Sequence, residues 1–272
     1  MTDNPKSGGV GLSGATGISS GLGGQGAAEI AAIFAVAVLV IGGGEFLLRH
    51  FEVPQYILPT PSAIGSVFTS AEVGTIAQHY GYTLVELFSG YAIGASVGLI
   101  LAAVITQFPF VEKVITPYIL LLVTTPMLAL VPLLILNFGF GYTPRIIAVA
   151  LASGPMVMIN AATGFRRVDA MKIALAKSYG ASTLQIFLKI RVPMAMPMVI
   201  VGLMIGAIFG MITAVGAEMS GGGFGLGSRL TTYSSTLRMP EFFACILVLA
   251  VTGIAIYAFF FWLGKRLAGW ES

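Results

Sequence analysis

The chain has 272 residues, a formal net charge of +3, and a composition that is 57% hydrophobic and only 9% charged. Soluble domains carry roughly a quarter charged residues, so the composition excludes an ordinary soluble domain and predicts an all-α integral membrane protein. The single cysteine, Cys245, lies in an apolar run, which excludes a disulfide framework and a cysteine-based metal site.

Composition divides the chain into three parts. Residues 1–26 are rich in Gly and Ser and predict a flexible cytoplasmic tail, residues 27–267 a transmembrane domain, and residues 268–272 a short C-terminal tail. The tail contains Gly21-x-Gly23-x-x-Gly26, the spacing of a dinucleotide fingerprint. No strand precedes it, so we assign no nucleotide site there.

The transmembrane domain contains apolar runs of about 20 residues, the length that crosses a bilayer. We predict six spans, at about 28–48, 82–106, 112–137, 144–165, 195–217 and 242–264, and the first is the least certain because Gly42-Gly43-Gly44 interrupts it. Between the first two, Thr60 and Pro61 are a good helix start. They predict a short amphipathic helix lying at the membrane surface.

Two predicted spans carry a glycine at every fourth position, which lines one face of a helix and lets another backbone approach closely. The pattern favours helix packing within the chain, and a role at a dimer interface or moving seam is the alternative. The glycines are Gly90, Gly94 and Gly98 in the second span and Gly202, Gly206 and Gly210 in the fifth.

The third span holds three prolines, Pro117, Pro126 and Pro132, each of which breaks helix hydrogen bonds. Such breaks are tolerated where protein or a cavity satisfies the freed carbonyls, so this span is expected to line a pathway rather than face lipid. Glu218 ends the fifth span before a glycine-rich outer segment, where it either pins the structure or lines a gate. The candidate pathway or gate residues are Pro126, Pro132, Glu218 and Met219.

No catalytic or metal-binding set is found in the sequence. His50 and His79 fall in the predicted outer connector, and we interpret them as exposed loop histidines. No G-x-x-x-x-G-K-[ST] loop occurs, so the chain has no ATP site of that kind. We therefore expect no cofactor in this chain and no enzymatic activity of its own.

The longest polar interruption is Arg166 to Pro193, which holds six of the fourteen Lys and Arg residues. Asp169 is predicted to cap a helix that runs to Tyr179, and Gly180 is predicted to end it in the left-handed conformation. Ser182 followed by Gln185 predicts a capping box that opens a second helix. The apolar stripe of that helix, which could enter a partner's groove or pack on the chain's own spans, is Leu184, Phe187 and Leu188.

The Lys and Arg residues also predict orientation, because cytoplasmic loops carry an excess of them. With the N-terminus in the cytoplasm, ten lie on the cytoplasmic side and four outside, so both termini and the 166–193 segment are expected in the cytoplasm. The outer four are Arg49, Arg145, Arg229 and Arg238.

The polar segment resembles the cytoplasmic signature of permease subunits of ATP-driven (ABC) importers. That signature is Glu-Ala-Ala, three residues, Gly, nine residues, Ile, one residue and Leu-Pro, and Gly180, Ile190 and Pro193 stand at matching positions. Ala176 matches the last alanine. The segment departs from the signature at three positions, Ala174, Leu175 and Val192.

Residues 58–63, 126–141 and 217–227 are similar to the branch of this family that serves nitrate, sulfonates, taurine and bicarbonate. The resemblance implies the type I ABC importer permease fold with a cytoplasmic coupling helix, in the bacterial inner membrane. It also implies a second permease copy, a cytoplasmic ATPase dimer that carries ATP and Mg, and an external solute-binding protein. The ATPase-coupling residues it implies are Ala176, Gly180, Ser182, Leu184, Gln185, Phe187, Leu188, Ile190 and Pro193.

We therefore expect the permease subunit of an importer of a small anionic solute, with Arg145 and Arg229 compatible with an anion. The alternative is a stand-alone ion-coupled secondary transporter or channel. That class needs ionisable residues near mid-membrane, and the centres of spans two to six show none. No nucleic-acid partner is expected.

Overall fold

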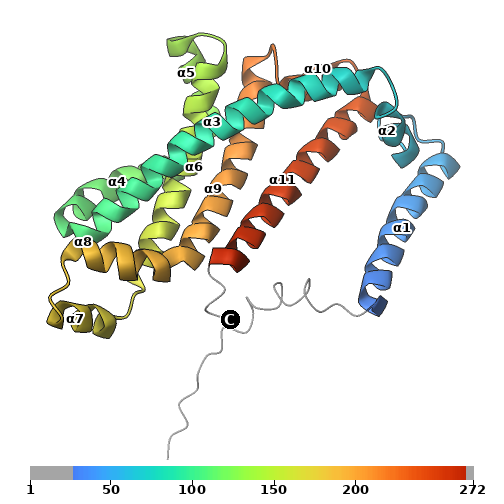
Figure 1. Cartoon of the computed structure of the whole chain (residues 1–272). Helices are drawn as coiled ribbons and strands as arrows, with labels where there is room; N and C mark the ends of the chain where they lie inside the picture. The colour runs from blue at the N-terminus through green and yellow to red at the C-terminus, as the bar shows by residue number, and fades with distance from the viewer. Residues whose placement is uncertain (1–26, 268–272) are drawn as a thin grey trace, which may run out of the picture. The chain divides into compact units, whose positions relative to one another are not determined.

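The computed structural model describes residues 27–267, all of whose regular elements are helices (Figure 1). The two predicted tails, 1–26 and 268–272, lie outside the described residues. The described residues divide into two units, one ending at Ser62 and one beginning at Ala63. They contain five helices long and apolar enough to cross a membrane, and up to six if one bent pair counts as a single span.

The first unit contains α1 (Ala27–His50) and the connector that follows it. Glu45, in the last turns of α1, holds the end of this connector: its carboxylate accepts hydrogen bonds from the Ser62 backbone N–H at 2.9 Å and from the Ser62 hydroxyl at 2.6 Å. The Arg49 Nε atom donates to the same carboxylate at 2.7 Å. The helix agrees with the first predicted span.

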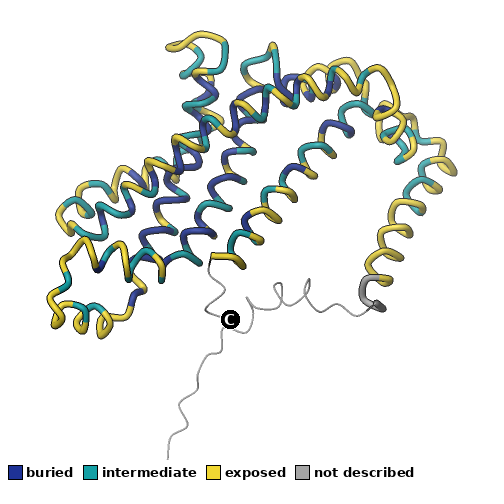
Figure 2. Tube along the Cα trace, viewed as in Figure 1, coloured by how far each residue is buried: buried dark blue, intermediate teal, exposed yellow. Residues whose placement is uncertain are grey.

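The second unit is a bundle built around three long helices. Its elements are α2 (Pro61–Val67, beginning at the unit boundary), α3 (Glu72–Gln107), α4 (Pro109–Thr124), α5 (Met127–Phe138), α6 (Tyr142–Arg166), α7 (Ala170–Ser178), α8 (Thr183–Ile186), the π-helical η1 (Phe187–Arg191), α9 (Val192–Gly221), α10 (Leu226–Ser235) and α11 (Met239–Leu267). In Figure 2 the buried positions concentrate on α6 and on the sides of α3 and α9 that face it.

The two glycine faces explain why α6 lies in the middle. A Cβ atom added to Gly94 of α3 would lie 2.5 Å from the Ala150 carbonyl oxygen of α6. One added to Gly206 of α9 would lie 3.1 Å from the Ser153 carbonyl oxygen, also on α6. Any larger residue would push the helices apart, so the prediction of helix packing within the chain is confirmed.

The helix α3 begins at Glu72, well before the predicted start at about 82. Its added turns are held by the α10 region: the Tyr233 hydroxyl donates to Glu72 at 3.1 Å, and Arg238 pairs with Glu72 at 2.8 Å. Burial and the Glu72 carboxylate raise the pKa of Tyr233 to about 12, so this hydroxyl keeps its proton. Because α3 is longer, His79 is buried inside it, and the prediction of an exposed loop histidine was wrong for this residue.

The third predicted span is not one helix. It consists of α4 and α5, which meet at Thr125 and Pro126 with a bend of 96°. Pro126 cannot donate a backbone hydrogen bond and is the N-terminal cap of α5, whereas Pro117 and Pro132 lie inside their helices without ending them. The prediction that proline breaks this segment is therefore confirmed at Pro126 but not at Pro117 or Pro132, and the bent pair counts as at most one span.

Candidate functional site

The polar segment begins with a short capped helix, α7. The Asp169 carboxylate accepts a hydrogen bond from the Met171 backbone N–H at 2.8 Å, as the sequence predicts. At the other end Gly180 adopts φ +77, and the Ala181 N–H donates to the Ala176 carbonyl at 3.0 Å. This geometry satisfies the last carbonyls of the helix and needs a residue that tolerates the left-handed region.

The second half opens with the predicted capping box. The Gln185 N–H donates to the Ser182 hydroxyl at 3.2 Å, and the Ser182 N–H donates to the Gln185 side-chain oxygen at 2.8 Å. The sequence predicts that the helix after this box is separate from the fifth membrane span, and this prediction was wrong. Instead α8, η1 and α9 form one helical run of 39 residues from Thr183 to Gly221, with π-helical hydrogen bonding between Phe187 and Arg191.

The segment combines exposed apolar and exposed polar side chains. Leu184 and Leu188 are 66% and 56% exposed, whereas Phe187 packs against Phe165 with ring centroids 5.1 Å apart. Of the apolar stripe, only the two leucines are therefore free to meet a partner. The other residues named from the sequence lie as follows: Gly180, Ser182, Gln185 and Pro193 are exposed, and Ala176 and Ile190 are half-buried.

Sequence reasoning missed three exposed apolar side chains on α7 and its cap. Met171, Leu175 and Tyr179 are 79%, 59% and 83% exposed. A signal existed, because these residues recur every four positions and therefore share one face of the helix. Beside Tyr179 lies a hollow of about 350 Å³, which extends to Gln185 and Lys189. Exposed apolar groups around a polar hollow are typical of a protein docking surface.

The segment is firmly joined to the spans. Ile186 is 4% exposed, and Phe187 and Val192 pack onto a core that includes Phe165 and Ala195 of α6 and α9. At its start the Arg166 guanidinium pairs with Glu112 of α4 at 2.8 Å. A force applied to α8 would therefore reach α6 and α9 through the packed side chains of Phe187 and Val192.

A second candidate feature is a cavity of about 280 Å³ at the bend between α4 and α5. Thr125 and Pro126 line it from the bend, Met156 from α6, and Phe209 and Thr213 from α9. The lining is mostly carbon and contains no charged residue among the positions that form it. Of the four candidate pathway residues, Pro126 is the one that lines this cavity. Pro132 and Met219 are exposed elsewhere on α5 and α9.

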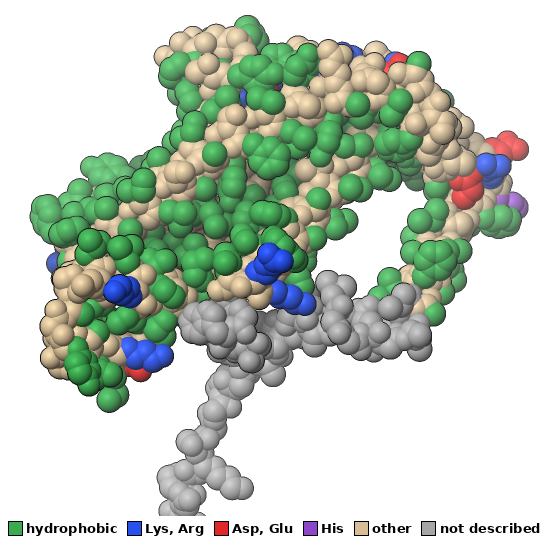
Figure 3. Space-filling view, in the orientation of Figure 1, with side chains coloured by type: hydrophobic (Ala, Val, Ile, Leu, Met, Phe, Trp, Pro, Cys, Tyr) green, Lys and Arg blue, Asp and Glu red, His purple; other side chains and the backbone are tan. Residues whose placement is uncertain are grey.

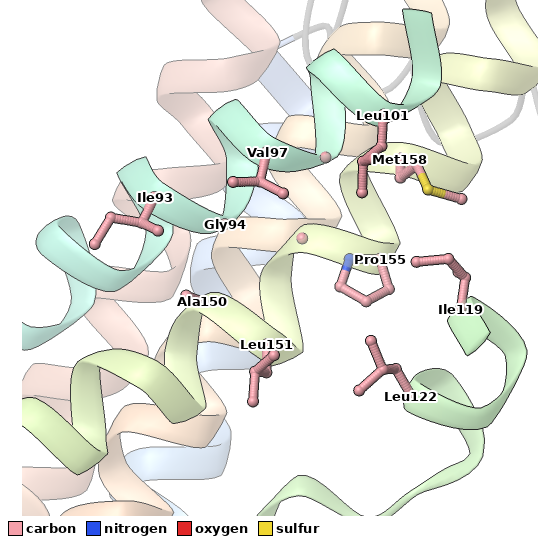
Figure 4. Close-up of a pocket in the computed structure, with 12 residues that line it drawn as sticks. Ile93, Gly94, Val97, Leu101, Ile119, Leu122, Ala150, Leu151, Pro155 and Met158 are labelled. Atoms are coloured by element: carbon pink, nitrogen blue, oxygen red, sulfur yellow. The ribbon is translucent and has the colours of Figure 1, made fainter. Parts of the chain in front are cut away.

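A smaller apolar pocket of about 190 Å³ adjoins this cavity between α3, α4 and α6 (Figure 4). The two hollows share Leu122, Leu151 and Pro155 as lining residues. Figure 4 shows Ile119 and Leu122 pointing from α4 toward Pro155 of α6. Two hollows therefore lie between α4 and α6, one on each side of Pro155. They leave room for α4 to shift.

Glu218, the third candidate pathway residue, is completely buried in a polar cluster. Its carboxylate accepts hydrogen bonds from the Thr83 hydroxyl at 2.7 Å and from the Gly227 N–H at 2.6 Å. Thr83 in turn accepts a bond from the Leu226 N–H at 2.9 Å. In this structure Glu218 therefore pins the glycine-rich segment 220–227 to α3.

Arg145 completes the cluster from the first turn of α6. Its guanidinium pairs with Glu86 of α3 at 2.8 Å and donates to the carbonyls of Gly222 and Phe224. The Phe224 ring lies 4.2 Å from the guanidinium carbon. Because these partners occupy Arg145, which is 2% exposed, it is not available to an anionic solute. A Cβ at Gly225, whose φ is +93, would clash with the Glu218 carboxyl group, so the segment requires glycine there.

Arg229, the second arginine considered for an anion, is also engaged. The Nε and Nη2 atoms of Arg229 lie 2.9 and 2.7 Å from the His79 Nε2 atom. Both arginine atoms are donors, so the imidazole accepts through Nε2 and is neutral. No group of three or more His, Cys, Asp and Glu side chains within residues 27–267 is placed to hold a metal ion.

Comparison with known proteins identifies the family. Residues 94–269, more than half of the chain, match the family described as binding-protein-dependent transport system inner membrane component. The taurine transport system permease protein TauC of Escherichia coli is 33% identical over 234 residues, which cover 80% of this chain and 82% of that protein. A putative aliphatic sulfonates transport permease protein of Bacillus subtilis is 28% identical and covers 79% of each chain.

Among solved structures, an amino acid ABC transporter has a chain that matches with a TM-score of 0.61 at 19% identity. The match covers 72% of this chain and 95% of that one. At this identity the likeness concerns the fold alone, and it confirms the predicted ABC importer permease fold. The chain belongs to the binding-protein-dependent transport system inner membrane components, the multi-pass, non-catalytic permease subunits of ABC importers.

Proposed function

We propose that this permease docks a cytoplasmic ATPase through the segment Arg166–Pro193 and imports a small anionic solute. The observation that carries the docking proposal is the shape of the segment, a capped helix, a left-handed Gly180 and a second helix continuous with a membrane span. Exposed Leu184 and Leu188 on one side of Gly180 and Tyr179 on the other supply apolar contacts. The ATP and Mg would be held by the partner, since the chain itself carries no phosphate-binding loop.

The continuity of α8, η1 and α9 supports a mechanical role. When two ATPases close on ATP, their movement would shift the docked segment as a rigid body and carry α9 with it. Because Arg166 is paired with Glu112, and Phe187 is packed on Phe165, α4 and α6 would follow. These three elements line the cavity at the α4–α5 bend, which is where we place the solute pathway.

The remaining partners follow from the family. A second copy of this permease would complete the pathway, and an external solute-binding protein would deliver the solute. The excess of Lys and Arg on the side of the 166–193 segment favours cytoplasmic termini and an inner-membrane protein with this segment facing the ATPase. A stand-alone ion-coupled carrier or channel remains the rival, but Arg145 is paired with Glu86 and bonded to the Phe224 carbonyl. Glu218 is bonded to Thr83 and to the Gly227 N–H.

The solute class rests on the relatives. The named taurine and aliphatic sulfonate permeases act on small sulfonates, which favours a small anion for this chain as well. Since Arg145 is fully engaged and the α4–α5 cavity lacks charged lining, we assign selection of the anionic group to the solute-binding protein. The cavity would accept the solute by size and shape.

Replacement of Gly180 tests the docking proposal. A Cβ at this position would meet no atom of this chain within 4 Å, so any effect on the permease itself must come from the backbone conformation. Gly180→Val cannot adopt φ +77 without a cost of about 1–2 kcal/mol or more, whereas Gly180→Asn tolerates it. We expect Gly180→Val to lose both ATPase co-purification and solute uptake, and Gly180→Asn to keep both. Normal values for the valine variant would refute the docking role.

A further inference from the structure

An apolar groove of about 370 Å³ lies on the second unit between α3 and α11, with α9 as its floor. Tyr80, Leu87 and Tyr91 line it from α3, Ala207 from α9, and Ala255 and Phe260 from α11. In Figure 1, α3 and α11 start close together beside α10 and then diverge. The groove is therefore a wedge, closed at the α10 end where the Thr252 hydroxyl donates to the Tyr80 hydroxyl at 3.0 Å.

The lining leaves no polar group in need of a ligand. The Tyr91 hydroxyl donates to the Leu203 carbonyl at 3.0 Å, and Thr252 and Tyr80 bond to each other. The other lining side chains are hydrocarbon or aromatic. A molecule that fills this groove must therefore present an apolar chain, because a polar one would lose its hydrogen bonds to water without replacement.

The open end of the wedge leads to two cations at the end of α11. Residues seven positions apart lie on nearly the same helix face, so Thr252, Phe259 and Arg266 form one line along α11. The Arg266 guanidinium lies 4.8 Å from the Trp262 ring centroid, and Lys265 lies 4.6 Å from the Phe261 ring centroid. Figure 3 shows these basic side chains at the end of α11, beside a largely hydrophobic face.

Neither cation has an acidic partner among the salt bridges of residues 27–267, in contrast to Arg145, Arg166 and Arg238. Ile256, inside the groove, lies ten residues from Arg266, or about 15 Å along the helix. That distance matches half of the roughly 30 Å hydrocarbon core of a bilayer. A cationic head site and an apolar groove are thus separated by the depth of one leaflet.

We propose that the groove between α3 and α11 binds an acyl chain of an anionic phospholipid whose phosphate is held by Lys265 and Arg266. The lipid comes from the leaflet at which these two residues lie. The acyl chain runs along α11 past Phe260 to Ala255. It fills the space between α3 and α11 where the two helices diverge. Anionic lipids are attracted to juxtamembrane basic residues, which explains the preference over a zwitterionic lipid.

The test uses the permease purified together with its ATPase and placed in nanodiscs of phosphatidylglycerol and phosphatidylcholine, with bound lipid counted by native mass spectrometry. We expect wild type to retain phosphatidylglycerol selectively. Because each basic residue contributes about 1 kcal/mol to anionic-lipid attraction, Arg266→Gln should weaken retention about fivefold, and Arg266→Lys should retain it.

Two alanines of α11 give a matched pair for the tail site. Both Ala255 and Ala258 are exposed, but only Ala255 lines the groove. We expect Ala255→Phe to displace the lipid and Ala258→Phe to leave it bound. Equal retention of both lipids by wild type, or no difference between the two alanine variants, would overturn the proposal. A photo-cross-linking residue at position 255 that captures a protein segment instead of lipid would also overturn it.

Discussion

The buried pair of Arg145 and Glu86 offers the sharpest prediction about stability. Arg145→Met removes one ion pair and two bonds to backbone carbonyls, and leaves Glu86 uncompensated in a site where both side chains are at most 2% exposed. Breaking a buried pair in this way costs about 3–5 kcal/mol. For a protein of this size that corresponds to a fall of roughly 6–20 °C in the midpoint of thermal unfolding.

The chain offers a matched control in Arg166 and Glu112. This pair has the same 2.8 Å separation, but its side chains are 47% and 38% exposed. An exposed pair contributes about 0–1 kcal/mol, so Arg166→Met should change the midpoint little. The assay is thermal unfolding of the purified permease in detergent, followed by tryptophan fluorescence, with proteolysis of the segment 220–227 as a local readout.

A double variant separates the cost of losing the ion pair from the cost of leaving Glu86 without a partner. Arg145→Met combined with Glu86→Leu removes the stranded carboxylate, so it should recover part of the lost stability. If Arg145→Met costs less than about 1 kcal/mol, or if the double variant is as unstable as the sum of its singles, the account of this cluster is refuted.

Three further outcomes follow from individual contacts. Gly94→Ala should destabilise the bundle by about 1–3 kcal/mol in thermal unfolding, because its Cβ meets the α6 backbone. Gly81→Ala on the same helix meets no atom and should be neutral or stabilising. Equal effects of the two variants would refute the close packing. Met156→Trp should fill the cavity at the α4–α5 bend and reduce solute uptake while ATPase co-purification stays normal, and unchanged uptake would remove this cavity from the pathway. Ser182→Ala removes a capping hydrogen bond that contributes about 1 kcal/mol, so hydrogen exchange at the Gln185 amide should accelerate about fivefold. An unchanged exchange rate would show that the cap contributes little.

The parts of the fold that could be predicted from the sequence depend on neighbours along the chain. Asp169, Gly180 and the Ser182–Gln185 box act within a few residues, so their residue types and spacing are sufficient to predict the geometry that the structure shows. The glycine faces of α3 and α9 are similarly local patterns, although the sequence did not indicate that both would pack on α6.

The parts that could not be predicted depend on distant residues. The early turns of α3 contain His79 and two glycines, which lower their hydropathy, and they are stabilised by Arg229 and Tyr233 from more than 140 residues away. The polar cluster joins Glu86, Arg145 and Glu218 from three helices, so no local pattern predicts it. The 96° bend at Pro126 was expected only as a break, since a proline does not by itself specify the angle.

The central claim is that the 166–193 segment contacts an ATPase, and site-specific cross-linking in membranes tests it most directly. A photo-cross-linking residue is placed at Leu184, which is 66% exposed on the segment, or at Phe140, which is 82% exposed in the connector between α5 and α6 and serves as the control. The account predicts a cross-link to a cytoplasmic ATPase from position 184 and none from position 140. No ATPase adduct from position 184, or equal adducts from both positions, would contradict it.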